Sequence, residues 1–235
     1  MKQLLFLLLT LVVTPEMKAQ QPLDVIIFGD SNTWGYNPST KDRFPKEIRW
    51  TGILQGKLGS EDTKIIEEGL VGRTTVYEDE KRPGLRGIDN IIKIFESKKD
   101  VDIDAVVLML GTNDCKTANH TTPKDIAGGI DRCLDIILKY VPAEKVLLIS
   151  PIHLGEYVWK DEYDPAFNER SVRVSKGLKK EYQRIARRRG VSFLAAADYV
   201  SPSSKDQEHL NEVGHSKLAD IIYNKLVNMN VCCAC

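Results

Sequence analysis

The sequence predicts an α/β protein in which helices cover both faces of a five-stranded parallel sheet. Short apolar runs of strand length alternate along the chain with longer segments of helical spacing. The 235 residues fall within the size range of one α/β domain, and 42% of them are hydrophobic, which is enough for a core. We find no internal repeat and no low-complexity linker. The expected architecture is therefore a single three-layer α/β/α domain.

Each expected strand is an apolar run that ends in a turn. The strands are predicted at residues 24–29, 64–68, 105–110, 145–150 and 191–196. The helices are predicted at residues 47–58, 86–98, 123–140, 168–189 and 211–228. Pro123, followed by Lys124 and Asp125, is typical of a first helical turn. The long irregular segments 36–48 and 152–168 are expected to be loops that shape a pocket at the carboxyl edge of the sheet.

The N-terminus is typical of a secretory signal peptide. A short basic start at Met1-Lys2-Gln3 precedes an apolar stretch of signal length, and Ala19 is followed by Gln20. We therefore expect a signal peptide over residues 1–19, a mature domain over residues 20–235 and a secreted or periplasmic location. The apolar stretch is too short for a comfortable membrane span, so no stable membrane insertion is expected after cleavage. An uncleaved anchor is the alternative.

The charge balance gives no reason to expect a nucleic-acid partner, and the cysteine content does not point to a function. Lys plus Arg and Asp plus Glu both number 33, so the net charge of zero gives no electrostatic case for binding nucleic acid. The basic stretch 176–189 is interpreted as a solvated helix face. The five cysteines leave at least one thiol unpaired within the chain in an exported protein. We assign no function to Cys232, Cys233 and Cys235, which crowd the C-terminus.

A possible nucleophile follows the first strand directly. Gly29-Asp30-Ser31 places a serine hydroxyl at the carboxyl end of a strand, where open α/β sheets keep their active sites. A serine needs a base to become a nucleophile. The alternative interpretation of Ser31 is a cap for the helix that follows.

Among the four histidines, His209 is the best candidate for that base. Asp206 precedes it by three residues, so a loop could let the carboxylate orient the imidazole. The alternative is a helix start in which Asp206 or Asn211 acts as the cap. His153, at the end of the fourth strand, is either a hydrogen-bonded loop histidine or a second histidine that contacts the substrate. His215 is expected to be structural and His120 to be solvated.

Two further strand ends carry groups that could stabilise an oxyanion. Gly72 follows the second strand, and Asn113 follows the third in Gly111-Thr112-Asn113-Asp114. A backbone N–H and an amide side chain at one sheet edge could donate to the same oxygen. Each residue also has a simpler interpretation, as a turn residue.

Taken together and in this order, the four segments resemble the SGNH hydrolase family, also called GDSL-type esterases. The resemblance spans about Leu23 to Leu226. It implies the flavodoxin-like SGNH hydrolase fold, with Ser31 as nucleophile, His209 as general base and acid, and Asp206 as the residue that orients His209. It also implies an oxyanion hole formed by the N–H groups of Ser31 and Gly72 and by the side chain of Asn113.

A closer resemblance links the chain to the arylesterase/acyltransferase branch of that family. It rests on the segments 29–35, 49–52, 67–70 and 73–75. Two departures stand out, because Asn32 replaces the usual Leu after the nucleophile and Gln207-Glu208 replaces the usual Gly-Ile or Gly-Val before the histidine. Glu208 is expected to raise the pKa of His209. Candidate substrate contacts are, from the sequence, Asn32, Trp34, Tyr36 and His153.

The function that the resemblance implies is hydrolysis of small, acetyl-type carboxylic esters through an acyl-enzyme. Acyl transfer to alcohols and deacetylation of carbohydrates are extensions of the same chemistry, and no metal or organic cofactor is needed. The expected partner is a small-molecule or acylated-glycan ester. The sequence leaves open whether the protein forms a homo-oligomer. The alternatives are a lipase or lysophospholipase acting on longer acyl chains, and a non-catalytic carbohydrate-binding relative.

Overall fold

A computed structural model of the chain describes residues 22–80 and 82–231. The signal peptide expected over residues 1–19 lies outside the described residues, as do the three cysteines at the C-terminus.

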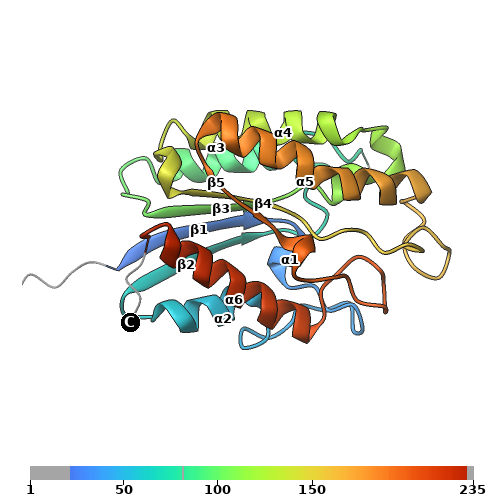
Figure 1. Ribbon diagram of the computed structural model, residues 1–235, viewed down its shortest axis with the longest axis horizontal. Coiled ribbons are helices and arrows are strands. Elements are labelled where there is room, and N and C mark those ends of the chain that lie inside the picture. The colour runs from blue at the N-terminus through green and yellow to red at the C-terminus, as the bar shows by residue number, and fades with distance from the viewer. Residues whose placement is uncertain (1–21, 81, 232–235) are drawn as a thin grey trace, which may run out of the picture.

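The described residues form a parallel sheet of five strands (Figure 1). Its strands are β1 (Leu23–Gly29), β2 (Thr63–Gly69), β3 (Ala105–Met109), β4 (Val146–Ser150) and β5 (Ser192–Ala195). Their order across the sheet is β2-β1-β3-β4-β5, and every neighbouring pair is parallel. This is the flavodoxin-like strand order, so the expected fold class is confirmed.

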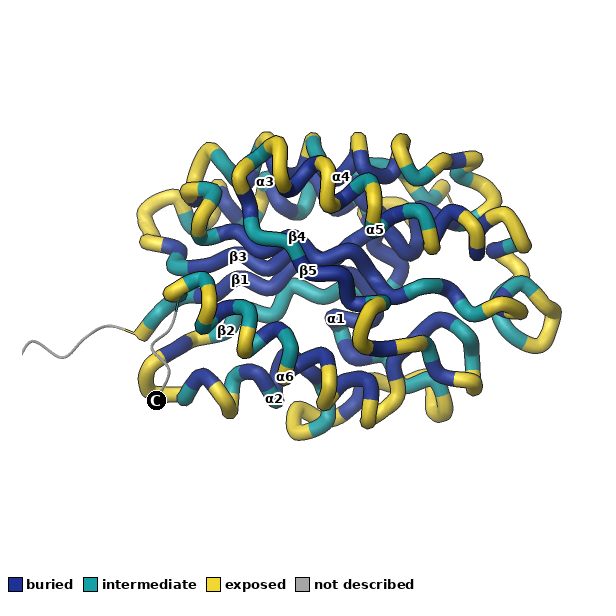
Figure 2. The backbone as a smooth tube through the Cα atoms, viewed as in Figure 1, coloured by how far each residue is buried: buried dark blue, intermediate teal, exposed yellow. Residues whose placement is uncertain are grey.

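Helices cover both faces of this sheet, as the parallel strands require. One face carries α3 (Gly87–Ser97), α4 (Pro123–Ile137) and α5 (Glu169–Arg189), and the other carries α2 (Trp50–Leu58) and α6 (Glu212–Asn228) (Figure 1). Figure 2 shows β1, β3 and β4 buried between these two layers, whereas β2 at the edge of the sheet is mostly of intermediate burial, and the exposed residues lie at the helix surfaces and in the loops.

Alternation along the strands divides the core into two halves. In β1, Ile26 and Phe28 pack toward α3, α4 and α5, whereas Val25 and Ile27 pack toward α2 and α6. This is the two-residue period of a strand that is buried on both faces, and it explains why β1 is a continuous apolar run. The largest buried side chain of the second half is Trp50, at the start of α2.

Helix boundaries differ from the expected ones where turns replace regular helix. The helix expected from residue 47 begins at Trp50, because the N–H groups of Ile48 and Arg49 both bond to the carbonyl of Pro45 in a preceding turn. The helix expected to reach residue 140 ends at Ile137. Its N-terminus is as expected: Pro123 occupies the first turn, and Thr122 and Asp125 form a reciprocal cap.

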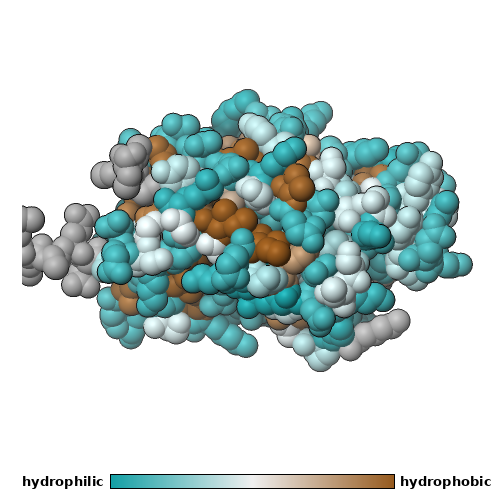
Figure 3. Space-filling view, turned by 90° about the horizontal axis from the view of Figure 1, so that it is seen from below, coloured by the Kyte–Doolittle hydropathy of each residue, from teal (hydrophilic) through white to brown (hydrophobic). Residues whose placement is uncertain are grey.

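Charged residues on the helix surfaces form ion pairs with neighbouring helices. The basic stretch at the end of α5 is in part paired, because Arg188 and Arg189 form ion pairs with Asp131 and Asp135 of α4. Figure 3 views the side of the molecule on which α2 and α6 lie, where hydrophobic patches are bordered by hydrophilic residues. Over the described ranges, no helix is long and apolar enough to cross a membrane.

Candidate active site

The carboxyl ends of the first three strands bring the candidate residues to one edge of the sheet. Ser31 follows β1 by two residues, Gly72 follows β2 by three and Asn113 follows β3 by four. Because these strands are parallel neighbours in the sheet, their carboxyl ends meet at the same edge. The sheet topology therefore gathers residues that are distant in the sequence.

Ser31 is the first residue of the short helix α1 (Ser31–Trp34), which is not among the five helices predicted from the sequence. The cap of this helix is Asp30, whose side chain accepts a hydrogen bond from the N–H of Asn32 at 3.0 Å. Ser31 is therefore not the cap. A helix this short is compact: a Cβ on Gly29 would lie 2.0 Å from the Thr33 hydroxyl, so only glycine fits before Asp30.

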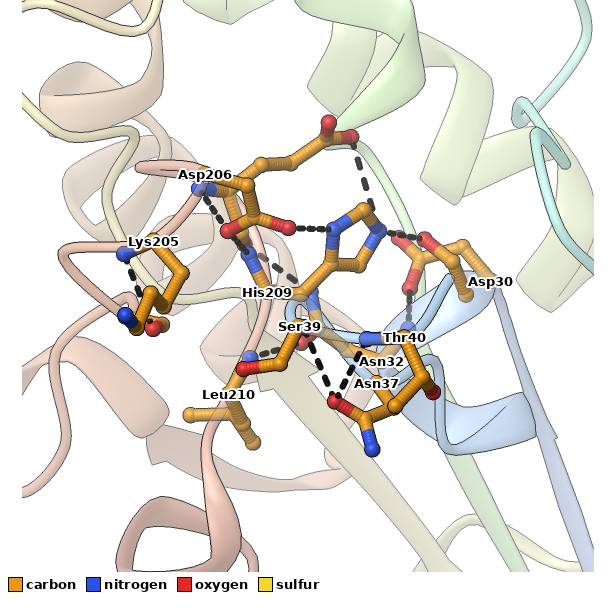
Figure 4. A network of polar contacts seen from close by, with 12 residues as sticks. Asp30, Asn32, Asn37, Ser39, Thr40, Lys205, Asp206, His209 and Leu210 are labelled. Atoms are coloured by element: carbon orange, nitrogen blue, oxygen red, sulfur yellow. Dashed lines mark hydrogen bonds and ion pairs between the residues drawn. The ribbon is translucent and has the colours of Figure 1, made fainter. Parts of the chain in front are cut away.

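The side chains of Ser31, His209 and Asp206 form a continuous hydrogen-bonded chain. His209 Nε2 lies 2.8 Å from Ser31 Oγ, and His209 Nδ1 lies 2.6 Å from Asp206 Oδ2. The other carboxylate oxygen of Asp206 accepts the backbone N–H groups of Glu208 and His209, each at 3.0 Å (Figure 4). Asp206 thus fixes both the imidazole and the loop that carries it, which is the arrangement a serine nucleophile requires.

The ring of Tyr36 packs against the imidazole ring of His209. Its ring centroid lies 4.2 Å from that of His209, with an angle of 32° between the planes. The hydroxyl of Ser31 and the imidazole of His209 are nearly closed to solvent, since the two residues are 2% and 6% exposed.

Electrostatics favour a protonated imidazole more than in water. Burial lowers the pKa of His209, but attraction to Glu208 and Asp206 and the hydrogen bond to Asp206 outweigh it, so this pKa lies above the ordinary 6.5. Burial likewise raises the pKa of Asp206, but the hydrogen bond and attraction to His209 bring it below the ordinary 3.8. The pair therefore stabilises the imidazolium that forms when His209 accepts a proton.

Gly72 and Asn113 lie together because their loops are bonded to each other. The amide of Asn113 donates to the carbonyl of Arg73 at 3.2 Å. The buried carboxylate of Asp114 accepts the N–H of Thr75 with both of its oxygens, at 3.0 Å each. Gly72 has a φ of 85°, a left-handed conformation that favours glycine.

Asp114 was expected from the sequence to cap or orient its loop, whereas Arg73 was not assigned a role of its own. Arg73 donates to the carbonyls of Gly29 and Glu68, and its guanidinium lies 4.1 Å from the ring centroid of Phe28. It therefore ties the ends of β1 and β2 together beside Gly72. Both Arg73 and Asp114 lie in segments that resemble the SGNH hydrolase family, 73–75 and 111–114. Their bonding partners, however, depend on tertiary contacts that the sequence does not show.

A cavity of about 660 Å³ adjoins Gly72 and Asn113. Its lining contains charged and polar side chains, but apolar atoms form more of the lining surface than polar atoms do. The lining residues are Gly72, Thr74, Glu78, Asp79, Glu80, Arg82, Asn113, Lys116, Thr117, Ala118, Asn119, Pro165 and Ala166. A Cβ on Gly72 would lie 2.6 Å from the guanidinium of Arg82, so this cation borders the cavity beside Gly72. The cavity offers room for a polar group next to the expected oxyanion site.

The residues expected to contact substrate occupy different environments. Asn32 is buried, and its side chain bonds to the backbone of Glu208 and Leu210 instead of facing the cavity. Trp34 lies beside Tyr36. Burial lowers the pKa of His153, and the charged groups that act on it are Lys176, Lys179 and Asp198, none of which belongs to the candidate site.

The two remaining histidines lie outside the candidate site. His215 is fully buried in α6, where its Nδ1 accepts the N–H of Trp50 at 3.3 Å. His120 is exposed. Within residues 22–80 and 82–231, no group of three or more His, Cys, Asp or Glu side chains could hold a metal ion.

Comparison with known proteins connects this geometry to a family. The model of the GDSL-like Lipase/Acylhydrolase family matches residues 27–217. Among curated proteins, the uncharacterized lipoprotein YqeF of Bacillus subtilis is 33% identical over 125 residues. That match covers 53% of this chain and 45% of YqeF, so the chain aligns with less than half of this relative.

Solved structures match over nearly their whole length. Est24, a carbohydrate acetylesterase from Sinorhizobium meliloti, is 34% identical with a TM-score of 0.79, and the match covers 88% of this chain and 99% of Est24. The native aryl esterase of M. Smegmatis is 30% identical, also with a TM-score of 0.79 and with coverage of 88% and 99%.

Proposed function

Because this chain belongs to the GDSL-like lipase/acylhydrolase family, we propose that it is a serine esterase that hydrolyses small carboxylic esters through an acyl-enzyme. The observation that carries the proposal is the chain of hydrogen bonds from Asp206 through His209 to Ser31, at 2.6 and 2.8 Å. A carboxylate–imidazole–hydroxyl chain of this length is what proton transfer from an attacking serine requires.

The proposed reaction has two halves. Ser31 Oγ attacks the ester carbonyl while His209 Nε2 takes its proton, and the resulting oxyanion is held by the N–H groups of Ser31 and Gly72 and by the Asn113 amide. His209 then protonates the leaving alkoxide, which departs and leaves an acyl group on Ser31. Water attacks that acyl group with the same base and releases the acid.

Small, acetyl-type acyl groups fit this proposal best. Est24 is a carbohydrate acetylesterase, and the M. Smegmatis protein is an aryl esterase. The cavity beside Gly72 and Asn113 carries charged and polar side chains that can hydrogen-bond to a hydrophilic alcohol such as a sugar, together with apolar surface. An acetylated glycan or another small ester is therefore the proposed substrate, and transfer of the acyl group to an added alcohol is a proposed side reaction.

Export to the cell envelope or beyond is part of the proposal. It rests on the composition of residues 1–19 and on the similarity to YqeF, which is named a lipoprotein. Expression of the full chain in a bacterial host, followed by N-terminal sequencing of the exported protein, tests the proposed cleavage after Ala19. A full-length protein that stays in the cytoplasm would contradict it.

A nucleophile knockout tests the esterase assignment directly. Ser31→Ala is expected to lower kcat on p-nitrophenyl acetate by about a million-fold while the protein stays folded. A fluorophosphonate probe should label the wild type but not this variant. The matched control is Ser150→Ala, because Ser150 is also buried at a strand end and its hydroxyl has no partner in the described structure. Substantial activity in Ser31→Ala would overturn the assignment.

The acyl-size preference needs its own assay. We expect the rate on p-nitrophenyl esters to peak at acetyl or propionyl and to fall sharply beyond about six carbons, in line with the similarity to an acetylesterase and an aryl esterase. Turnover of decanoyl or palmitoyl esters at or above that of acetyl esters would favour the lipase or lysophospholipase alternative. Lack of turnover with every ester, together with no labelling by the probe, would favour the non-catalytic alternative.

A further inference from the structure

The side chain of Glu208 is a buried carboxylate that the reaction described so far does not use. Glu208 is 7% exposed and immediately precedes His209. Its backbone is held from both sides: the N–H donates to Asp206 Oδ1 at 3.0 Å, and the carbonyl accepts the amide of Asn32 at 3.4 Å. The backbone that carries this side chain is therefore held in the same loop as the imidazole.

The carboxylate of Glu208 faces the nitrogen of His209 that performs the proton transfers. Glu208 Oε1 lies 3.9 Å from His209 Nε2, which is the nitrogen bonded to Ser31 Oγ. Over the described ranges, this is its one ion-pair contact, and no hydrogen-bond donor of the protein reaches its carboxylate. Lys116 lies near enough to attract Glu208, but it forms no ion pair with it. A buried carboxylate in this state retains unused capacity to accept hydrogen bonds.

The separation of 3.9 Å suits a single bridging molecule. It is too long for a direct hydrogen bond, but two hydrogen bonds of about 2.8 Å that meet at one oxygen atom span it easily. During deacylation, Ser31 Oγ is part of an ester and no longer donates to Nε2, so the attacking molecule must donate there. An oxygen atom held at Nε2 then lies within reach of Glu208 as well.

We propose that Glu208 accepts the second hydrogen of the water that attacks the acyl-enzyme, and thereby directs the acyl group to water in preference to a monohydric alcohol. The proposal rests on the esterase function proposed above. Water carries two O–H groups and can donate to His209 and Glu208 at once. A monohydric alcohol has one O–H group, which it must donate to His209, so its oxygen lone pairs would face the carboxylate.

The protons and bonds of this step balance without any change at Glu208. The water oxygen bonds to the acyl carbon while one water proton moves to His209 Nε2 and the other stays hydrogen-bonded to Glu208. The tetrahedral intermediate then collapses, the bond from the acyl carbon to Ser31 Oγ breaks, and the proton on Nε2 moves to Oγ. The free acid leaves, and Glu208 ends the step in the protonation state in which it began.

The partition of the acyl group between two acceptors tests this role. Wild type, Glu208→Val and Glu208→Gln are incubated with p-nitrophenyl acetate in water that contains ethanol, and ethyl acetate and acetate are measured by NMR. We expect Glu208→Val to raise the ratio of ethyl acetate to acetate by about tenfold, because the hydrogen bond between water and a charged group is lost. Glu208→Gln keeps an acceptor oxygen and should give an intermediate ratio.

A ratio of two products does not depend on the fraction of folded enzyme, so a purely structural role would leave it unchanged. Rapid mixing should also show a burst of p-nitrophenol in Glu208→Val, since deacylation slows more than acylation. Glu212→Gln is the matched control, because Glu212 is an exposed glutamate in the next helix, and its ratio should equal that of the wild type.

Failure of this inference is distinguishable from failure of the esterase assignment. A Glu208→Val enzyme that is labelled by the fluorophosphonate probe but partitions within twofold of the wild type would overturn the role of Glu208 alone. A parallel loss of hydrolysis and transfer with an unchanged ratio would also overturn it. A wild type that neither turns over esters nor reacts with the probe would instead overturn the function on which the inference rests.

Discussion

Asn32 accepts a hydrogen bond from the backbone N–H of Leu210 at 3.0 Å through its side-chain oxygen. Its amide nitrogen donates to the carbonyl of Glu208 at 3.4 Å, and its own carbonyl accepts the indole N–H of Trp50 at 3.0 Å. Asn32 directly follows Ser31, and His209 lies between Glu208 and Leu210. The side chain of Asn32 therefore holds the loop that carries His209, the proposed base, against the helix that carries Ser31, the proposed nucleophile.

The first prediction concerns the replacement of Asn32 by leucine, the residue usual at this position in the arylesterase/acyltransferase branch. Asn32→Leu leaves the buried N–H of Leu210 without a partner, so we expect the free energy of unfolding to fall by about 1–3 kcal/mol. Displacement of His209 from Ser31 should lower kcat by about tenfold to a hundredfold. Urea denaturation and p-nitrophenyl acetate kinetics measure the two effects.

Asn224→Leu is the surface control for that experiment, because Asn224 is exposed on α6. Unchanged stability and kcat in Asn32→Leu would show that the position of the catalytic loop does not depend on the amide.

Asn113 provides a test of the oxyanion hole. Asn113→Ala should lower kcat by about a hundredfold to a thousandfold with a smaller effect on KM, since the amide acts on charge that develops in the transition state. Asn113→Asp, of similar shape, should be at least as inactive because it places a carboxylate beside the oxyanion. An effect confined to KM would instead assign Asn113 to binding of the ground state.

Asp114 is expected to act through stability. Burial raises its pKa to about 7, and its carboxyl holds the N–H and the hydroxyl of Thr75. Asp114→Ala leaves that buried N–H unpaired, so thermal or urea unfolding should show a loss of about 1–3 kcal/mol. The exposed Asp100 gives the control Asp100→Ala. A fully stable Asp114→Ala protein with lowered kcat would move Asp114 from a structural to a catalytic role.

Stability below neutral pH should depend on His215. Burial lowers its pKa to about 4 from 6.5, so the unfolded chain binds a proton in this range while the folded chain does not. The free energy of unfolding that His215 contributes is therefore present above pH 6.5 and is lost as the pH falls toward 4. By linkage, this loss amounts to about 3 kcal/mol.

His215→Asn removes the titration but keeps an acceptor for the N–H of Trp50. Urea denaturation at pH 7 and pH 4.5 should therefore show a smaller acid loss in this variant than in the wild type. The exposed His120→Asn serves as control and should follow the wild type. Equal pH dependence in all three proteins would exclude His215 as a source of acid sensitivity.

The fold was largely predictable because its signals are local. An apolar run such as Val25 to Phe28 predicts a strand buried on both faces, and Pro123 marks a helix start without reference to any distant residue. The short helix α1 escaped prediction because one turn gives no periodicity. The start of α2 was misplaced because a turn at Pro45 uses the N–H groups that a longer helix would have used.

The candidate site was predictable in its residues but not in all of its contacts. Ser31, Gly72, Asn113 and the Asp206–His209 pair were identified because each stands in a short motif at the end of an element, and the structure brings Ser31 and His209 to 2.8 Å across 178 positions of the chain. Asn32 was expected to contact the substrate because it directly follows the proposed nucleophile, Ser31. The opposite direction of its side chain depends on a loop that returns 176 residues later.

The sequence by itself determined where the five strands and the longer helices lie to within a few residues, and which strand ends carry reactive side chains, because both follow from patterns within about ten residues. Only the tertiary structure decided what those side chains touch: Asn32 on Leu210, Asp114 on Thr75 and Glu208 beside His209 Nε2. The first two contacts join loops whose relative position depends on the order of strands in the sheet. The third depends on the path of a loop held by Asn32. No local periodicity in the sequence encodes the order of the strands or the path of this loop.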